Sequence, residues 1–164
     1  MNSQQRSPTS TAGELLAVLA DRAETVATAE SLTAGLLCAT LTDVPGASSV
    51  VRGGLIVYAT DLKCSLAGVD DALLAEHGPV HPAVARQLAQ GARSRCEAVW
   101  GVGLTGVAGP GAQGDSAAGT VHIGVAGPGM VTSRSLHLPG ERSEVREHTA
   151  HAAIEVLLEH VAGA

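Results

Sequence analysis

A serine at the end of an apolar run is the first residue of this chain that could do chemistry. Ser31 lies in TAESLTAG, where a short apolar run gives way to small, helix-forming residues. Its hydroxyl would either cap the following helix, the commoner role, or act as a nucleophile. A nucleophile there would have the N–H groups and positive dipole end of the following helix nearby to stabilise an oxyanion. The residue type alone leaves both roles open.

Lys63 is the residue best suited to serve as a base for such a serine. Nine of the ten basic residues are arginines, and Lys63 is the only lysine. An arginine keeps its proton at working pH, whereas a partly desolvated lysine can lose it. The alternative, which composition alone favours, is an exposed lysine with no special role. If Ser31 is a nucleophile, Lys63 is the base that remains, because the seven scattered histidines suggest no Ser-His-Asp arrangement.

The histidines and cysteines form no recognisable metal or redox motif. His77 and His81 straddle Pro79, which excludes the helical i, i+4 spacing of metal ligands. His148 and His151 lack a carboxylate or cysteine partner at a recognisable spacing, so a solvated face is the expected role. The three cysteines are widely spaced without a CxxC pair and are expected to be reduced thiols of a cytoplasmic protein. We therefore expect no metal and no cofactor.

Two further stretches have compositions that suit anions. TGVAGPGAQGD, beginning at Thr105, follows an apolar run but matches neither GxGxxG opening a helix nor GxxxxGK[ST]. Its main-chain N–H groups fit a ligand-cradling loop and a purely structural loop equally well. Arg142 and Arg146 are four residues apart at the start of a helical segment. They either pair with Glu141 and Glu144 on the surface or clamp an anion.

These residues have to be positioned by elements that alternate along the chain. The expected helices are 13–22, 31–41, 82–95 and 141–161, with a short helix or turn at each of 61–68 and 70–77. The expected strands are 25–29, 50–59, 98–104, 120–126 and 130–138. This alternation, with a late hairpin, predicts an α/β fold: a three-layer α/β/α sandwich with a mixed β-sheet in a single domain. If the strands ending at Ala29, Tyr58 and Leu104 are neighbours, Ser31 and Lys63 share the edge where open α/β sheets bind ligands.

Length and composition limit the class of protein. A chain of 164 residues with 45% hydrophobic and 16% charged residues fits one globular domain. The first dozen residues are polar and lack the apolar segment of a signal peptide, so we expect a disordered tail over 1–12 and the domain over 13–164. No apolar run approaches the roughly 20 residues that cross a bilayer, and we expect no membrane partner. The net charge of −6 and the presence of only two aromatic residues, Tyr58 and Trp100, argue against a nucleic-acid partner.

Six stretches together resemble the CinA C-terminal domain family. They are TAESLTAGLL, VVRGGLIVYATDLKCSLAGV, HGPVHPAVARQLAQGAR, GLTGVAGPG, GTVHIGVA and LPGERSEVREHT, in the family's order from about residue 13 to 161. This family contains amidohydrolases that convert nicotinamide mononucleotide (NMN) to nicotinate mononucleotide and ammonia without a metal. The resemblance implies a stand-alone form with no preceding molybdopterin-binding-like domain, acting in pyridine nucleotide (NAD) salvage. We expect a cytoplasmic homo-oligomer whose partner is the small molecule NMN.

The resemblance also implies roles for individual residues. The family's serine nucleophile falls on Ser31, its lysine base on Lys63, and its tyrosine on Tyr58, which would orient the lysine. Its hydroxyl residue before the Gly-rich loop falls on Thr105, and its arginine on Arg142. The substrate-binding positions, several of them expected to hold the ribose and phosphate, are Glu30, Thr33, Ser48, Thr105, Gly106, Ala108, Gly109 and Arg142.

The sequence departs from the family at two places and leaves two other functions open. Leu32-Thr33-Ala34-Gly35 stands where the family usually has Cys-Thr-Gly-Gly, and Glu141 stands where it commonly has Asp. The methyl group of Ala34 puts the detail of the pocket in doubt rather than the chemistry. The alternatives are a non-catalytic nucleotide-binding module, in which Ser31 only caps a helix, and a hydrolase of another small amide on the same fold.

Overall fold

The computed structural model describes residues 8–164, in which helices and strands alternate. The helices are α1 (Pro8–Asp21), α2 (Leu36–Thr42), α3 (Thr60–Ser65), α4 (Asp71–His77), α5 (Pro82–Arg95) and α6 (Arg142–Ala162), with a 3₁₀ turn η1 (Ala47–Ser49). The strands are β1 (Val26–Glu30), β2 (Val51–Ile56), β3 (Trp100–Gly106), β4 (Thr120–Gly127) and β5 (Met130–His137). Each strand expected from the apolar runs is present, and β4 and β5 form the expected hairpin.

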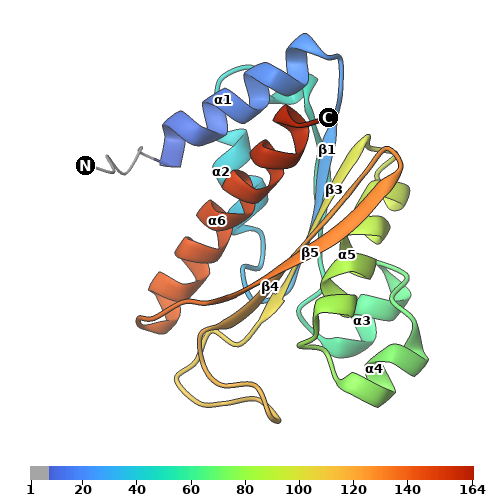
Figure 1. The fold of residues 1–164 in the computed structure, drawn as a ribbon, viewed down its shortest axis with the longest axis vertical. Helices are drawn as coiled ribbons and strands as arrows, with labels where there is room; N and C mark the ends of the chain where they lie inside the picture. The colour runs from blue at the N-terminus through green and yellow to red at the C-terminus, as the bar shows by residue number, and fades with distance from the viewer. Residues whose placement is uncertain (1–7) are drawn as a thin grey trace.

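The five strands form one mixed sheet in the order β2-β1-β3-β4-β5. β1 pairs in parallel with both β2 and β3, while β3–β4 and β4–β5 are antiparallel. Helices α1, α2 and α6 cover one face, and α3, α4 and α5 cover the other (Figure 1). With helices on both faces, β1 is buried along its whole length, which explains its small and mainly apolar side chains. The predicted three-layer α/β/α sandwich with a mixed sheet is confirmed.

Two apolar cores lie on opposite faces of the sheet and fix its position. The larger core joins α1, α2 and α6 to the sheet and includes Leu15, Trp100 and Ile154. The smaller core lies under α5 and includes Leu88. Gly103 of β3 permits α5 to approach closely, because a Cβ there would lie 2.3 Å from the main-chain oxygen of Ala85. This close packing holds the segment before α5 near the end of β3.

Several element boundaries differ from those expected; β2, for example, ends at Ile56 rather than at residue 59. Two of the differences concern the first two helices. α1 begins at Pro8, so residues 8–12 belong to a helix rather than to the expected tail, and residues 1–7 lie outside the described part of the chain. α2 begins at Leu36 and not at Ser31, because Ala34 and Gly35 both have positive φ and interrupt the helical path. Ser31–Gly35 therefore form a turn, which we call the serine turn. None of the helices in residues 8–164 has the length and apolar character needed to cross a membrane.

Candidate active site

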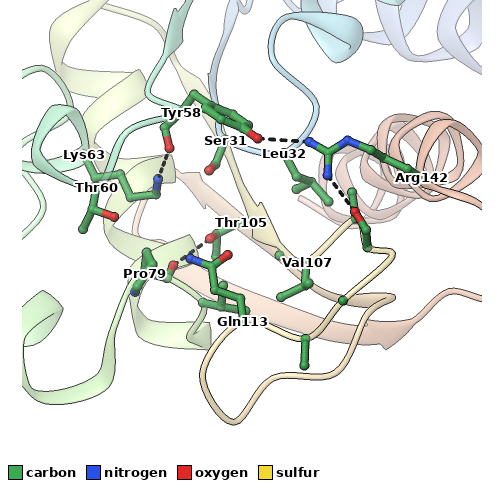
Figure 2. A pocket seen from close by; sticks show the side chains of 16 residues that line it. Ser31, Leu32, Tyr58, Thr60, Lys63, Pro79, Thr105, Val107, Gln113 and Arg142 are labelled. Atoms are coloured by element: carbon green, nitrogen blue, oxygen red, sulfur yellow. Dashed lines mark hydrogen bonds between the residues drawn. The ribbon is translucent and has the colours of Figure 1, made fainter.

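The carboxyl ends of three strands lie side by side and form one rim. Glu30 at the end of β1 pairs with Ile56 of β2 and Leu104 of β3. The segments that follow these strands therefore meet at one edge, as the order of elements predicted. A cavity of about 440 Å³ opens between them (Figure 2). It is lined by Ser31, Leu32, Tyr58, Thr60, Lys63, Pro79, Val80, Thr105, Gly106, Val107, Ala108, Gly109, Gly111, Ala112, Gln113 and Arg142.

Lys63 lines this cavity from α3 and is only 1% exposed. Its Nζ donates to the main-chain oxygens of Val57 (2.8 Å) and Tyr58 (3.1 Å). Burial lowers the pKa of Lys63 to about 8, an effect that the carboxylate of Asp61 partly opposes. A neutral amine has two N–H bonds and one lone pair, so two carbonyl acceptors satisfy its donors and leave the lone pair for an incoming proton. The surroundings of Lys63 therefore suit a general base.

Ser31 is the first residue of the serine turn and lies at the cavity wall. Its main-chain N–H donates to the oxygen of Leu104 (3.0 Å), which ties the turn to the end of β3. Gly35, not Ser31, is the residue that precedes α2, so Ser31 does not cap that helix. Within residues 8–164 no hydrogen bond engages Ser31 Oγ. Figure 2 shows the side chains of Ser31 and Lys63 reaching the cavity from different segments.

Arg142 connects three segments across the cavity. It is the first residue of α6, and its guanidinium donates to the main-chain oxygen of Gly109 (2.7 Å) and to the hydroxyl of Tyr58 (3.0 Å) (Figure 2). The Tyr58 side chain is 58% exposed. Tyr58 therefore orients Lys63 through its main-chain carbonyl rather than through its phenol. The hydroxyl of Thr105 is buried and donates to the oxygen of Pro79 (2.6 Å).

Three residues that the sequence assigned to substrate binding do not line the cavity. The carboxylate of Glu30 is buried and accepts hydrogen bonds from the N–H groups of Gly35, Leu37 and Cys38 and from the hydroxyl of Thr28. It fixes the start of α2, and its oxygens are fully engaged. Glu30 was expected to contact the substrate, and this assignment needs correction: its carboxylate supports the serine turn instead.

The predicted substrate-binding roles of Thr33 and Ser48 also need correction. Thr33 is completely buried, and its Oγ1 has no hydrogen-bond partner among the described residues. Ser48 is exposed in η1, just before β2, and lines a separate surface pocket. Since β2 runs parallel to β1, the start of β2 lies at the opposite edge of the sheet from Ser31. The remaining predicted residues, Ser31, Tyr58, Lys63, Thr105, Gly106, Ala108, Gly109 and Arg142, all line the cavity.

The sequence reasoning missed the segment that closes the cavity next to Thr105. Pro79 and Val80 line it, although they precede a helix and do not follow a strand. The HGPVHP stretch was the available signal, because two prolines within six residues indicate a fixed turn. Arg146 was considered only as part of an ion-pair face or anion clamp. Its guanidinium instead donates to the carbonyls of the serine turn.

No cluster able to hold a metal ion is found in the part of the chain that the structure describes. Nowhere in residues 8–164 do three or more histidine, cysteine, aspartate or glutamate side chains gather so that they could hold a metal ion. The rings of His77 and His81 stack at 4.3 Å, and His81 Nδ1 accepts the N–H of Ala83 at the start of α5. The local role of His81 is therefore that of a helix cap.

Residues 8–161 match the CinA C-terminal domain. The chain belongs to this family. It is 47% identical over 151 residues to a CinA-like protein of Frankia casuarinae, a match that covers 92% of this chain and 35% of that protein. A CinA-like protein of Anaeromyxobacter sp. (strain Fw109-5) is 46% identical over 87% of this chain and 35% of its own length. The chain thus spans about a third of the length of the curated relatives it matches.

Solved structures of CinA-superfamily proteins share the fold. The competence/damage-inducible protein CihA of Agrobacterium tumefaciens has a TM-score of 0.90 and 31% identity, over 97% of this chain and 98% of that one. A CinA superfamily protein of Enterobacter cloacae has a TM-score of 0.94 and 24% identity, over 98% and 96%. The names of these relatives give the family but no reaction, so the chemistry has to be argued from the cavity.

Proposed function

We propose that this CinA-family domain hydrolyses the carboxamide of NMN to nicotinate mononucleotide and ammonia, as the family resemblance implies. The observation that carries the proposal is the buried Lys63, which lines the same cavity as Ser31 and has a pKa near 8. A serine nucleophile served by a lysine base is a pairing known from acyl-transfer enzymes, and here both residues line one cavity. A lysine kept only for its charge would gain nothing from this burial.

The proposed reaction uses Ser31 as nucleophile and Lys63 as base and acid. Ser31 Oγ attacks the amide carbon while Lys63 Nζ takes its proton, which gives a tetrahedral oxyanion. The C–N bond then breaks, and Lys63 returns the proton to the departing nitrogen, which leaves as ammonia. Water attacks the acyl-serine, again giving a proton to Lys63, and Lys63 returns it to Ser31 as nicotinate mononucleotide leaves.

The rest of the cavity suits a nucleotide. Its volume of about 440 Å³ is in the range of small-molecule sites. Arg142 is a forked donor suited to a phosphate, and the main chain from Gly106 to Gly109 lines the same wall. Together with Thr105, these groups would hold the ribose and phosphate in the same cavity as Lys63.

The proposed function is tested by ammonia release from a substrate panel. Protein dialysed against a chelator should release one ammonia per nicotinate mononucleotide formed from NMN, and little from nicotinamide or glutamine. A non-catalytic module would release none. A preference for glutamine or nicotinamide would assign the site to another amide. Activity that disappears on dialysis and returns with zinc would contradict the Ser–Lys chemistry.

The pKa of Lys63 predicts the pH dependence of the reaction. Lys63 accepts a proton only when neutral, so kcat/KM should rise with pH and level off above the pKa of about 8. Below that value it should fall about tenfold per pH unit. Nicotinamide riboside is the control, because it lacks the phosphate, which titrates near pH 6. A profile that is flat across this range for both substrates would contradict the assignment of Lys63 as base.

Removing Arg142 should weaken substrate binding more than it slows chemistry. Phosphate contacts are made equally in the ground state and the transition state, so Arg142→Ala should raise KM by about tenfold or more with little change in kcat. The same substitution should leave the KM for nicotinamide riboside nearly unchanged, since that substrate has no phosphate. Unchanged KM values for NMN would refute the role of Arg142, as would equal changes for both substrates.

A further inference from the structure

The serine turn is fixed by two charged side chains that do not line the cavity. At its carboxyl end, Glu30 accepts the N–H groups of Gly35 (3.0 Å) and Leu37 (3.1 Å). From α6, the partly buried Arg146 donates through Nε to the oxygen of Leu32 (2.8 Å) and through Nη2 to that of Thr33 (3.2 Å). An arginine that donates hydrogen bonds to two carbonyl oxygens of one turn holds the peptide planes of that turn in place.

These contacts decide which N–H groups can stabilise an oxyanion. The N–H groups at the start of α2, expected to do so, are engaged by the Glu30 carboxylate and by the oxygen of Thr33. The N–H of Ala34 donates to the oxygen of Ser31 (3.1 Å). No hydrogen bond between described residues engages the main-chain N–H of Leu32 or Thr33. Buried N–H groups without a partner are rare. Leu32 lines the cavity, whereas Thr33 is completely buried and does not, so of the two only the N–H of Leu32 can meet a ligand there.

The carbonyl contacts also orient these two N–H groups. In a planar trans peptide the C=O and the following N–H point in opposite directions. The oxygen of Leu32 faces Arg146, so the N–H of Thr33 points away from α6. The oxygen of Ser31 faces Ala34, so the N–H of Leu32 points away from the interior of the turn. Leu32 itself lines the cavity beside Ser31.

We propose that the main-chain N–H of Leu32 is an oxyanion-hole donor and that Arg146 is the positioning residue that holds it. Arg146 fixes the oxygen of Thr33, and the N–H of Ala34 in the same peptide fixes the oxygen of Ser31, whose peptide carries the N–H of Leu32. The inference rests on the proposed acyl transfer at Ser31 and extends it to residues that the family resemblance did not assign. Arg146 touches neither substrate nor nucleophile and acts by fixing the turn. This role accounts for a partly buried guanidinium that binds no carboxylate among the described residues.

The test uses Arg146→Met and Arg146→Lys with two readouts. An alkyl fluorophosphonate reports on Ser31 without depending on NMN: Oγ bonds to phosphorus, fluoride leaves and Lys63 takes the proton. Arg146→Met should slow both this labelling and kcat for NMN by about 100-fold, the effect of losing an oxyanion donor. The KM for NMN should stay within about threefold of the parent value. Arg146→Lys can still donate to one of the two carbonyls, so its labelling rate and kcat should lie between those of the parent and Arg146→Met.

Arg134→Met is the matched control, because Arg134 contacts α6 through Glu159 on the exposed surface, away from the serine turn. It should leave both rates unchanged. The fraction of protein labelled at the end of the reaction measures how many chains are folded. If Arg146 had a purely structural role, its substitution would lower this final fraction and leave the labelling rate constant of the folded chains unchanged. That outcome would overturn the inference, as would a kcat for Arg146→Met within about threefold of the parent.

A second variant keeps the test decisive if Arg146→Met does not fold. Replacing Leu32 by its α-hydroxy analogue turns its N–H into an ester oxygen and should slow labelling by about 100-fold. The same replacement at Leu36, whose N–H donates within the turn to Thr33, controls for the ester itself. An unchanged rate at position 32 would overturn the inference. The protein could be labelled in a way that depends on Arg146 and yet be inert toward NMN; this would refute the proposed substrate and support the oxyanion hole. A protein that is neither labelled nor active toward NMN would refute both proposals.

Discussion

Lys63→Arg should reduce turnover of NMN by roughly 10⁴-fold, because a guanidinium cannot give up its proton at working pH. The substitution keeps the positive charge, so it separates a base from a cation that only attracts the phosphate. Lys63 Nζ is held by the carbonyls of Val57 and Tyr58 in a buried position, and Asp61 is the nearby charge that affects its pKa. A cationic role would therefore be served nearly as well by arginine. Steady-state ammonia release measures the difference.

Lys63→Met provides the control for folding. It has a similar length, carries no charge, and should be as inactive as Lys63→Arg. Melting curves of both variants show whether the loss of activity accompanies loss of structure. If Lys63→Arg retained more than about a tenth of parental kcat in a folded protein, Lys63 would not be the base.

Ser31→Ala should lose turnover by about 10⁴-fold or more while keeping its stability. Ser31 begins the serine turn and is not the cap of α2, which is Gly35, and no hydrogen bond among described residues engages its hydroxyl. The variant therefore loses no cap, and its free energy of unfolding should stay within about 0.5 kcal/mol of the parent. A helix-cap serine predicts the reverse, a loss of about 1 kcal/mol with turnover intact.

Ser48→Ala is the matched control for Ser31→Ala. Ser48 is an exposed serine at the opposite edge of the sheet, so its variant should keep full activity. The double variant Ser31→Ala with Lys63→Arg should lose little beyond either single change, because the two residues act in the same step. Multiplicative losses would mean that the two side chains work separately and would contradict the pairing.

Much of the fold was predictable because four of its five strands are either buried or joined in a hairpin. β1 and β3 consist mainly of small and apolar residues, and the Gly-Pro-Gly turn between β4 and β5 marks the hairpin. The start of α2 was not predictable from periodicity, because small residues continue the helical pattern through Ser31–Gly35. The boundary is set by a tertiary contact, in which the Glu30 carboxylate binds the first N–H groups of the helix.

The cavity was predictable as far as its residues follow strands. Ser31 follows β1, Lys63 lies in the helix after β2, and Thr105 stands near the end of β3, before the loop to Gly109. The parallel pairing brings these strand ends together. Ser48 was misassigned because it precedes a strand. The sequence left the role of Arg146 ambiguous, because Arg146 lies one helical turn after Arg142 and therefore on the same face of the helix. Only the packing of α6 shows that one guanidinium reaches the cavity and the other the serine turn.

The central claim is that NMN passes through an acyl-serine at Ser31, and partitioning with hydroxylamine measures this directly. Hydroxylamine attacks an acyl-serine in competition with water and releases a hydroxamate, while ammonia has already left in the preceding step. We predict that the parent protein releases ammonia from NMN and transfers the acyl group partly to water, giving nicotinate mononucleotide, and partly to hydroxylamine, giving the hydroxamate. The ratio of hydroxamate to nicotinate mononucleotide should rise in proportion to the hydroxylamine concentration. Ser31→Ala should give neither product. Ammonia release with no hydroxamate at any hydroxylamine concentration, or equal hydroxamate formation by Ser31→Ala, would contradict the account.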